Sequence, residues 1–249
     1  MANLYGTQLA SVYEEIYQGF IDYEAEYEFY KLICKKFDAS HILELGCGTG
    51  NLSASSTRDF ETYTGLDYSK AMLNIAKKKF PDGDFLNGDM RDLRLKEPYS
   101  AVLITGRSTS YLLNNSDLER TFASVSNILA PKGIFVFDTI NAVHFMPFIA
   151  KNEQISHFSS YNNKKFVRES RWKKHESDQY ELVAWNAAYF KITENEKQFL
   201  GKDTSIFRTF HQKEITAVLE KYEFEILDII ERKTYAFDTQ VFSCRKQMS

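Results

Sequence analysis

The sequence is short of several residues that define particular classes of protein. It has three cysteines, Cys34, Cys47 and Cys244, and no two of them form a Cys-x-x-Cys pair. This argues against a disulfide framework or a zinc knuckle and suits a reducing compartment. The sequence also lacks an apolar run long enough to span a bilayer, and no basic segment followed by an apolar one begins it. We therefore expect a cytoplasmic protein with no metal site and no membrane partner.

Positive charge is not in excess either. The chain carries 31 Lys and Arg residues against 34 Asp and Glu residues, for a net charge of −3. A protein that binds nucleic-acid phosphates usually presents a basic face, so no nucleic-acid partner is expected. Apolar residues make up 43% and aromatic residues 15% of the 249 residues. This composition suits a sizeable core, with a few rings left to line a pocket for a small or cationic ligand.

Residues 42–52 carry the strongest local pattern. A short apolar run ending at Leu45 is typical of a buried strand, and three glycines follow at alternate positions, Gly46, Gly48 and Gly50. Glycines let the backbone turn sharply and let a ligand approach the bare main chain. A dinucleotide-binding fingerprint would have its third glycine at position 51, where Asn51 stands. The pattern predicts a strand, a nucleotide-facing loop and a helix.

Three acidic residues accompany this loop. Glu44 lies two residues before the first glycine, Asp67 ends the next apolar segment, and Asp89 follows the third. An acid at the end of a strand can bind the two ribose hydroxyls of a nucleotide at the edge of an open α/β sheet. Because the three positions agree with one mechanism, we prefer a nucleoside site to the alternative of a tight strand–helix turn without a ligand.

The first 140 residues alternate apolar strands with amphipathic helices. Ser69 is expected to cap one helix, and Ser116 with Glu119 to form the capping box of another. A cap helix with an apolar stripe is expected near Val12 and Ile16. Five rounds of strand and helix indicate a parallel, doubly wound sheet, with strands at 41–45, 62–66, 84–86, 102–105 and 134–137.

The pattern changes after residue 140. From Phe166 to Phe210 it has period two and is rich in aromatic and β-branched residues, which predicts antiparallel strands. Thr209 with Gln212 is expected to cap a helix, and a hairpin follows over 224–230 and 235–242. We divide the chain into an N-terminal cap with a cofactor-binding core at 1–140, an antiparallel β insertion acting as a substrate lid at 141–210, and a completing helix and hairpin at 211–249.

These motifs resemble those of the class I S-adenosylmethionine-dependent methyltransferases. Their first motif is similar to residues 44–50, their ribose-binding acid to Asp67, and their adenine-side segment to residues 88–92. The resemblance implies an α/β fold: a doubly wound, seven-stranded Rossmann-like methyltransferase sheet with its last strand antiparallel. A narrower resemblance to bacterial aminosugar N,N-dimethyltransferases rests on residues 13–17, 90–95, 111–112 and 210–212, although those enzymes end in a glycine-arginine segment where this chain has residues 235–238.

The resemblance implies S-adenosyl-L-methionine as the cofactor and S-adenosyl-L-homocysteine as the product. It also implies the cofactor-binding residues, which are Tyr17, Glu44, Gly46, Cys47, Gly48, Gly50, Asp67, Tyr68, Met72, Asp89, Met90 and Thr105. Cys47 is more simply a small space-filler than a nucleophile, since a sulfonium donor needs none. The sulfonium activates the methyl group, so the protein has to align donor and acceptor, exclude water and accept a proton.

Three residues are candidates for catalysis. Tyr17 would close over the donor, Arg107 follows the fourth strand, and His211 could accept a proton from the acceptor. His211 could equally cap a helix through a backbone hydrogen bond. We expect methyl transfer to N or O of a small molecule by a monomer or homodimer. The alternatives are a tRNA or protein methyltransferase, a non-catalytic protein that binds the donor, and a nucleotide-dependent oxidoreductase.

Overall fold

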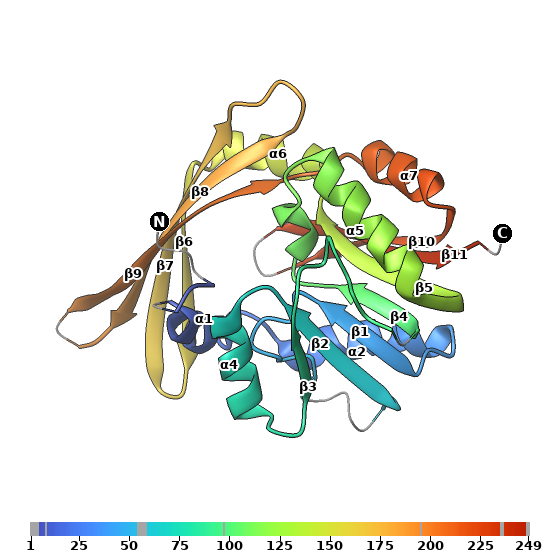
Figure 1. Ribbon diagram of the computed structural model, residues 1–249. Coiled ribbons are helices and arrows are strands. Elements are labelled where there is room, and N and C mark those ends of the chain that lie inside the picture. Colours follow the sequence, from blue (N-terminus) through green and yellow to red (C-terminus); the bar gives the residue numbers. More distant parts are fainter. Residues whose placement is uncertain are drawn as a thin grey trace.

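The chain forms two β-sheets flanked by helices (Figure 1). The computed structural model describes residues 5–7, 9–53, 59–96, 98–194, 196–234 and 237–247. The larger sheet has seven strands, which lie in the order β10 (Phe224–Lys233), β11 (Asp238–Lys246), β5 (Leu129–Ile140), β4 (Tyr99–Ile104), β1 (His41–Leu45), β2 (Thr62–Asp67) and β3 (Asp84–Asn87). β11 runs antiparallel to both of its neighbours, while the pairs from β5 to β3 are parallel. The predicted seven-stranded sheet with an antiparallel last strand is confirmed.

Helices flank the two sheets (Figure 1). They are α1 (Ala10–Tyr17), α2 (Tyr23–Lys36), α4 (Lys70–Lys79), α5 (Asn115–Ile128), α6 (Ala142–Lys151) and α7 (Gln212–Lys221), with a short 3-10 turn η1 (Ser108–Tyr111). The cap predicted at Ser69 is confirmed, because its Oγ accepts a hydrogen bond from Met72 N at 3.2 Å. The helix expected directly after the glycine loop falls largely on residues 54–58, outside the described part of the chain.

Two predicted helix caps are wrong. Asn114, not Ser116, caps α5, and its side chain accepts from Asp117 N at 2.8 Å. Asn caps a helix at least as well as Ser, and it comes first in the chain. His211, not Thr209, precedes α7, and its N–H donates to Glu214 Oε2 at 2.8 Å. The hydroxyl of Thr209 instead donates to the carbonyl oxygen of Glu181, which holds it to the second sheet.

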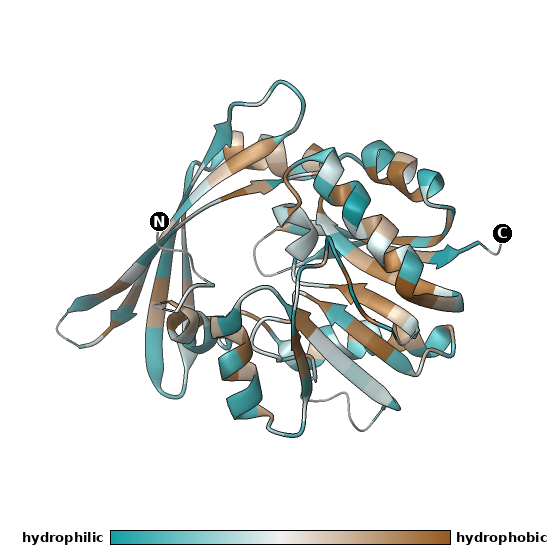
Figure 2. Cartoon of the chain, in the orientation of Figure 1, coloured by the Kyte–Doolittle hydropathy of each residue, from teal (hydrophilic) through white to brown (hydrophobic). Residues whose placement is uncertain are grey.

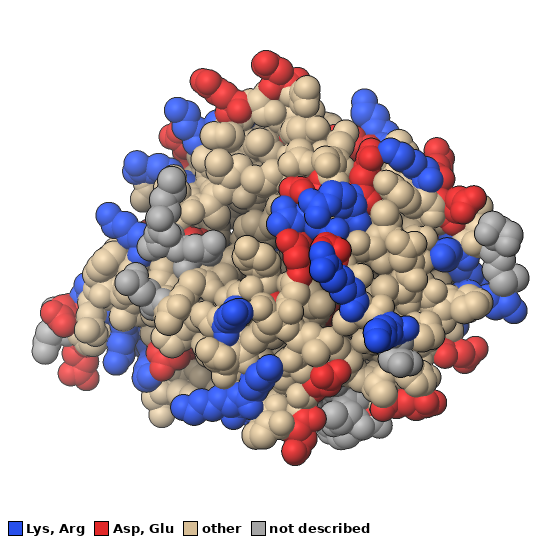
Figure 3. Space-filling view, viewed as in Figure 1, with Lys and Arg blue, Asp and Glu red and all other residues tan. Residues whose placement is uncertain are grey.

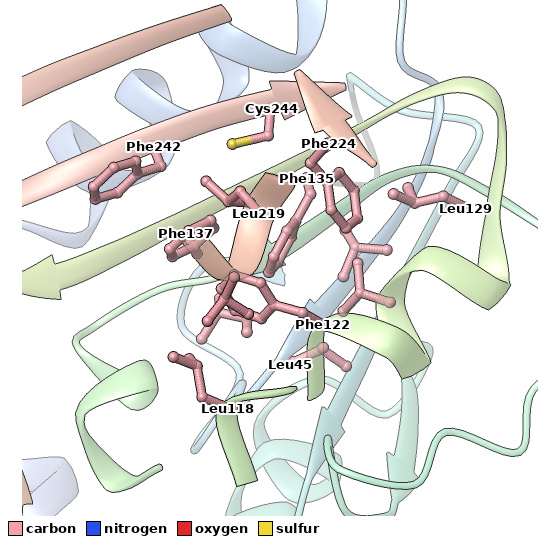
Figure 4. Close-up of a cluster of buried hydrophobic side chains, with 14 of the residues drawn as sticks. Leu45, Leu118, Phe122, Leu129, Phe135, Phe137, Leu219, Phe224, Phe242 and Cys244 are labelled. Carbon is pink, nitrogen blue, oxygen red and sulfur yellow. The ribbon is translucent and has the colours of Figure 1, made fainter. Parts of the chain in front are cut away.

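The main core lies between the larger sheet and helices α5 and α7. Figure 4 shows the aromatic side chains of Phe122, Phe135, Phe137 and Phe242 converging there, and all four are fully buried. In Figure 2 the strands are largely hydrophobic, whereas the outer faces of the helices are hydrophilic. Continuous apolar strands of this kind are typical of a parallel sheet covered on both faces. This packing fixes the carboxyl ends of the strands in one row.

The second sheet, which we call the roof sheet, is an antiparallel meander. Its strands are β6 (Gln154–Tyr161), β7 (Lys164–His175), β8 (Leu182–Ile192) and β9 (Lys197–Arg208). They fall within the range predicted for the insertion, although the sequence pattern missed β6. Figure 1 shows the roof sheet reaching beyond one end of the larger sheet, with α1 beside it.

The helices and the surface charges also bear on the sequence predictions. No helix in the described ranges is both long enough and apolar enough to cross a membrane. On the face seen in Figure 3, the Lys and Arg side chains are interspersed with Asp and Glu side chains.

Candidate functional site

A cavity of about 600 Å³ lies between the carboxyl ends of the larger sheet and the roof sheet. Its lining includes residues from the loops after β1, β2 and β4, from the end of β5, from α1, and from β7, β8 and β9. The volume falls within the usual range for small-molecule sites, roughly 300–1,000 Å³. In open α/β sheets ligands bind beyond the carboxyl ends of the strands, which is where this cavity lies.

The glycine loop forms one wall of the cavity with bare backbone. Gly48 has a φ of +56°, and a Cβ atom placed on it would have no neighbour within 4 Å. The third glycine has a different role, since a Cβ on Gly50 would lie 2.8 Å from the Phe85 ring. Gly50 is also absent from the cavity lining, which includes Gly46, Cys47 and Gly48. The loop therefore offers main chain to a ligand at Gly48 and packs against β3 at Gly50.

Asp67 shapes this loop from the end of β2. Its Oδ2 accepts a hydrogen bond from Gly48 N at 2.8 Å, and its Oδ1 accepts from Ser69 N at 2.7 Å. Burial raises the pKa of Asp67 above its ordinary value, and the two backbone donors oppose that shift. A carboxylate held in this way keeps lone pairs for further donors such as hydroxyls.

Glu44 lies beneath the loop and is almost completely buried. Its two carboxylate oxygens accept hydrogen bonds from Thr105 Oγ1 at 2.9 Å and from Tyr63 OH at 3.0 Å. Burial raises the pKa of Glu44 to about 7, against the effect of these two hydroxyls. Both oxygens are thus occupied from within the protein, and Glu44 and Thr105 line the cavity together.

The adenine-side segment predicted at Asp89 and Met90 also lines the cavity. Asp89 makes an ion pair with Arg91, whose NH2 lies 2.7 Å from Asp89 Oδ2, and this arginine holds the pKa of Asp89 below its ordinary value. Arg91 in turn contacts Asp117 of α5 at 3.1 Å. The lining further includes Tyr68, which is exposed, and Met72, which is buried.

Helix α1 covers the cavity and is fastened on two sides. Tyr17 OH accepts a hydrogen bond from Arg168 NH1 of the roof sheet at 2.8 Å. On the other side, Gln18 donates to the Asn51 side chain at 2.8 Å. Asn51, which stands where a dinucleotide loop would have glycine, therefore ties the end of α1 to the glycine loop. Tyr17 itself lines the cavity, and its closure over the donor stays a prediction.

The remaining wall of the cavity comes from large side chains. Trp172 of β7 and Trp185 of β8 line it while also packing in the core of the roof sheet. Their Nε1 atoms are buried and have no hydrogen-bond partner in the described part of the chain, and the same holds for Ser110 Oγ. Arg107, a predicted catalytic residue, also lines this side, with its guanidinium carbon 4.9 Å from the centre of the Phe237 ring.

The predicted site and the structure differ at His211. It caps α7, its Nε2 lies 3.3 Å from Glu181 Oε2, and it is not among the residues that line the cavity. Its role as proton acceptor stays a prediction. Sequence reasoning also missed three charged residues of the lining: Glu26, Asp138 and Arg168. Asp138 follows the apolar run of residues 134–137, as Asp67 follows an apolar run, whereas Glu26 in the first turn of α2 and Arg168 within β7 carry no such mark.

Comparison with known proteins supports the methyltransferase resemblance. Residues 42–133 match a family model described as a methyltransferase domain. The match covers β1 to the start of β5, which contain the glycine loop, Asp67, Asp89 and Thr105. The predicted resemblance to methyltransferases is thereby confirmed over this segment.

Two curated relatives from Streptomyces are aminosugar enzymes. The dTDP-3-amino-3,4,6-trideoxy-alpha-D-glucopyranose N,N-dimethyltransferase of Streptomyces venezuelae is 36% identical over 138 residues, which cover 54% of this chain and 58% of that protein. The dTDP-3-amino-3,6-dideoxy-alpha-D-glucopyranose N,N-dimethyltransferase of Streptomyces fradiae is 29% identical over 137 residues, 54% of each chain. The chain thus spans little more than half the length of these relatives.

Solved structures match over nearly the whole chain. Streptomyces venezuelae DesVI has a TM-score of 0.81 and 25% identity, with 94% of this chain and 97% of that chain covered. CalS10 of Micromonospora echinaspora, an amino pentose methyltransferase solved with S-adenosylmethionine bound, has a TM-score of 0.77 and 19% identity, with 95% and 97% covered. The second match concerns the fold alone. The two-sheet architecture, roof sheet included, is therefore a methyltransferase fold.

The residues present fit S-adenosylmethionine. Gly48 leaves open space where a side chain would intrude, and Asp67 stands beside it with both oxygens fixed by backbone donors. Thr105 and Glu44 form a polar pair at the base of the same cavity, and Met90 supplies an apolar surface. The predicted cofactor agrees with this donor set and with the matched family.

Proposed function

We propose that this protein transfers a methyl group from S-adenosylmethionine to an amine nitrogen of a small hydroxylated molecule, an amino sugar. The observation that carries the proposal is the division of one cavity into two unlike walls. One wall is the glycine loop with Asp67, Asp89 and Thr105, and the other is the aromatic surface of the roof sheet. A donor and an acceptor can thus be held face to face.

The donor, when bound, supplies an electrophilic methyl group on a sulfonium, so no nucleophilic side chain is required. The work of the chain is to orient and to exclude water. Asp67 and the backbone at Gly48 would hold the ribose and methionine portions, and Asp89 would accept from the adenine amino group. Tyr17, fixed by Arg168, covers the cavity and limits the access of water.

The roof wall supports a hydroxylated acceptor. A buried indole N–H usually has a partner, yet Trp172 and Trp185 each present one without a partner in the described ranges, and so does the hydroxyl of Ser110. These three atoms have almost no accessible surface, so a sugar hydroxyl would satisfy them after a small turn of the side chains toward the cavity, which would remove the cost of leaving them unpaired. The aromatic rings also suit a cationic amine, because a ring face attracts positive charge.

The relatives favour nitrogen over oxygen. Both curated relatives are N,N-dimethyltransferases of dTDP-linked amino sugars by their names. The residues at which those enzymes carry a glycine-arginine segment correspond to 235–238, and Tyr235 and Ala236 lie outside the described residues. We therefore include nucleotide-linked amino sugars as acceptors to be tested beside free ones.

Two measurements test this function. Titration calorimetry should show binding of S-adenosylhomocysteine and no binding of NADH. Transfer of a labelled methyl group should then be followed with amino sugars, dTDP-amino sugars and the matched sugars that carry a hydroxyl in place of the amine. We expect label in the amino sugars alone. Binding of NADH would overturn the methyltransferase function, and label only in the hydroxyl sugars would overturn the choice of nitrogen.

A further inference from the structure

Asp138 is a second buried carboxylate of the cavity, distinct from Glu44 in its contacts. It lies at the carboxyl end of β5, next to the loop that follows β4, because Ile104 pairs with Phe137 in the parallel register. Asp138 lines the cavity and is 5% exposed. The adjacent strand end carries Thr105, which contacts Glu44. Two carboxylates thus belong to one row of strand ends.

The two carboxylates differ in how many of their oxygens are occupied. Asp138 Oδ1 accepts a hydrogen bond from Arg107 N at 2.8 Å. No hydrogen bond from the described residues reaches Asp138 Oδ2. In Glu44, by contrast, both oxygens are engaged by hydroxyls. Asp138 therefore keeps one oxygen for a ligand in the cavity, and Glu44 does not.

Charged and titratable groups face Asp138 from three neighbouring elements. The Arg107 guanidinium belongs to the loop after β4, Glu26 and Tyr30 come from α2, and Arg232 comes from β10. Glu26 and Arg232 are paired with each other through two hydrogen bonds of 2.9 and 3.0 Å. Burial raises the pKa of Asp138 to about 7, partly offset by Arg107. The carboxyl is thus neither firmly ionised nor firmly neutral near pH 7.

An amine acceptor has a proton to lose. An alkyl ammonium is the main form of such an amine near neutral pH, and it has no lone pair with which to attack. A carboxylate of raised pKa in this cavity is suited to take that proton, since a general base works best when its pKa lies near the operating pH. Asp138 belongs to the same lining as Trp172, Trp185 and Ser110, which we assigned to the acceptor.

We propose that Asp138 is the catalytic base that accepts the proton of the acceptor ammonium. This inference rests on the proposed function. The proton passes from nitrogen to Asp138 Oδ2, and the freed lone pair then forms the bond to the methyl carbon. The bond between carbon and sulfur breaks with its electron pair going to sulfur, and Asp138 afterwards releases the proton to solvent. Where a second methyl group is added, the first product gives up its proton in the same way.

The test compares four variants in the full chain. Asp138→Asn keeps an oxygen that can accept the hydrogen bond from Arg107 N but removes the titratable carboxyl. Asp138→Glu restores a carboxylate. Glu44→Gln is the matched control, because it removes the other buried carboxylate with a pKa near 7. Asp228→Asn, on β10 outside the cavity, controls for loss of a carboxylate in general. The readouts are S-adenosylhomocysteine affinity by calorimetry and kcat for an amino sugar from pH 5 to pH 9.

We expect Asp138→Asn to lower kcat at pH 7 by about 10²-fold while binding S-adenosylhomocysteine within about twofold of the wild type. The rise of kcat through about pH 7 should disappear in this variant, remain in Glu44→Gln, and return in part in Asp138→Glu. Asp228→Asn should match the wild type throughout. A merely structural role would lower kcat without abolishing the rise.

Three results would overturn the inference. In the first, Asp138→Asn has the kcat of the wild type and keeps the rise of kcat near pH 7. In the second, Glu44→Gln loses the rise while Asp138→Asn keeps it, which would assign the titration to the donor side. In the third, the wild type binds S-adenosylhomocysteine but methylates no amine at any pH. That last outcome removes the proposed acceptor class, and the role of Asp138 with it.

Discussion

The two walls of the cavity are built in opposite ways. On the donor wall, polar groups find their partners inside the protein: Asp67 takes two backbone donors, and Glu44 takes two hydroxyls. On the roof wall, large rings present buried N–H groups with no partner in the described residues. A wall whose polar groups already have hydrogen-bond partners within the protein holds its shape before the ligand binds. A wall with open donors gains most when a ligand of matching chemistry binds.

This contrast predicts which substitution has the largest effect on cofactor binding. Asp67→Ala removes the carboxylate that fixes Gly48 N and Ser69 N and that we assign to the ribose. Loss of charge-assisted hydrogen bonds at a half-buried site should weaken S-adenosylhomocysteine binding by more than about tenfold. Titration calorimetry measures this directly. Asp92→Ala, which removes an exposed acid outside the cavity, is the control. An unchanged affinity in Asp67→Ala would show that the cofactor lies elsewhere.

The second largest effect should appear on the roof wall. Trp185→Phe keeps a large ring but removes the unpartnered N–H. If that group donates to an acceptor hydroxyl, KM for the acceptor rises by about three- to tenfold, the worth of one buried hydrogen bond. Donor affinity should stay within about twofold. Phe199→Leu, an exposed position on β9, provides the control. Equal changes in donor and acceptor binding would remove the distinction between the two walls.

The same contrast explains what the sequence could predict. Donor-wall residues sit at the ends of strands in a short, regular pattern, so Gly46, Gly48 and Asp67 were found from spacing alone. The roof wall is made of residues such as Arg168 and Trp185 in the middle of long strands. Period two places a residue on one face of a sheet but does not say which face meets the cavity. Their place in the cavity lining depends on how α1 packs beside the roof sheet, which the sequence pattern does not give.

Gly50 shows what the spacing of glycines cannot predict. It belongs to the glycine pattern as much as Gly48, and the resemblance implied that it binds the cofactor. In the structure its missing side chain makes room for Phe85 and its φ is +74°, so its need for glycine comes from packing and backbone conformation. Spacing identifies where the backbone must be bare, and it does not tell whether a ligand or a neighbouring ring requires it.

The buried carboxyl of Glu44 in the donor wall should also make the stability of the folded protein depend on pH. The pKa of Glu44 is about 7 in the folded protein, above the ordinary value of about 4.3 that the unfolded chain would have. Its contribution to stability is therefore complete below about pH 4 and is lost as pH rises through 7. Glu44→Gln stays neutral throughout, so it should lose less Tm between pH 5 and pH 8 than the wild type, by about 5–10 °C. Parallel slopes of Tm against pH would contradict the raised pKa.

The smallest effect should come from His211, which belongs to neither wall. Its N–H caps α7 through Glu214, a contact that a backbone group makes and that His211→Ala retains. The pair between its ring and Glu181 is partly exposed, and such pairs contribute about 0–1 kcal/mol. We expect kcat within about twofold of the wild type and a Tm lowered by less than about 4 °C, with Glu181→Gln showing the same small change. A proton acceptor would behave differently, because its loss lowers kcat by about 10²–10⁴-fold with Tm unchanged. A fall of that size in His211→Ala would bring this residue into the chemistry and would require that the loop before α7 reach the cavity during the reaction.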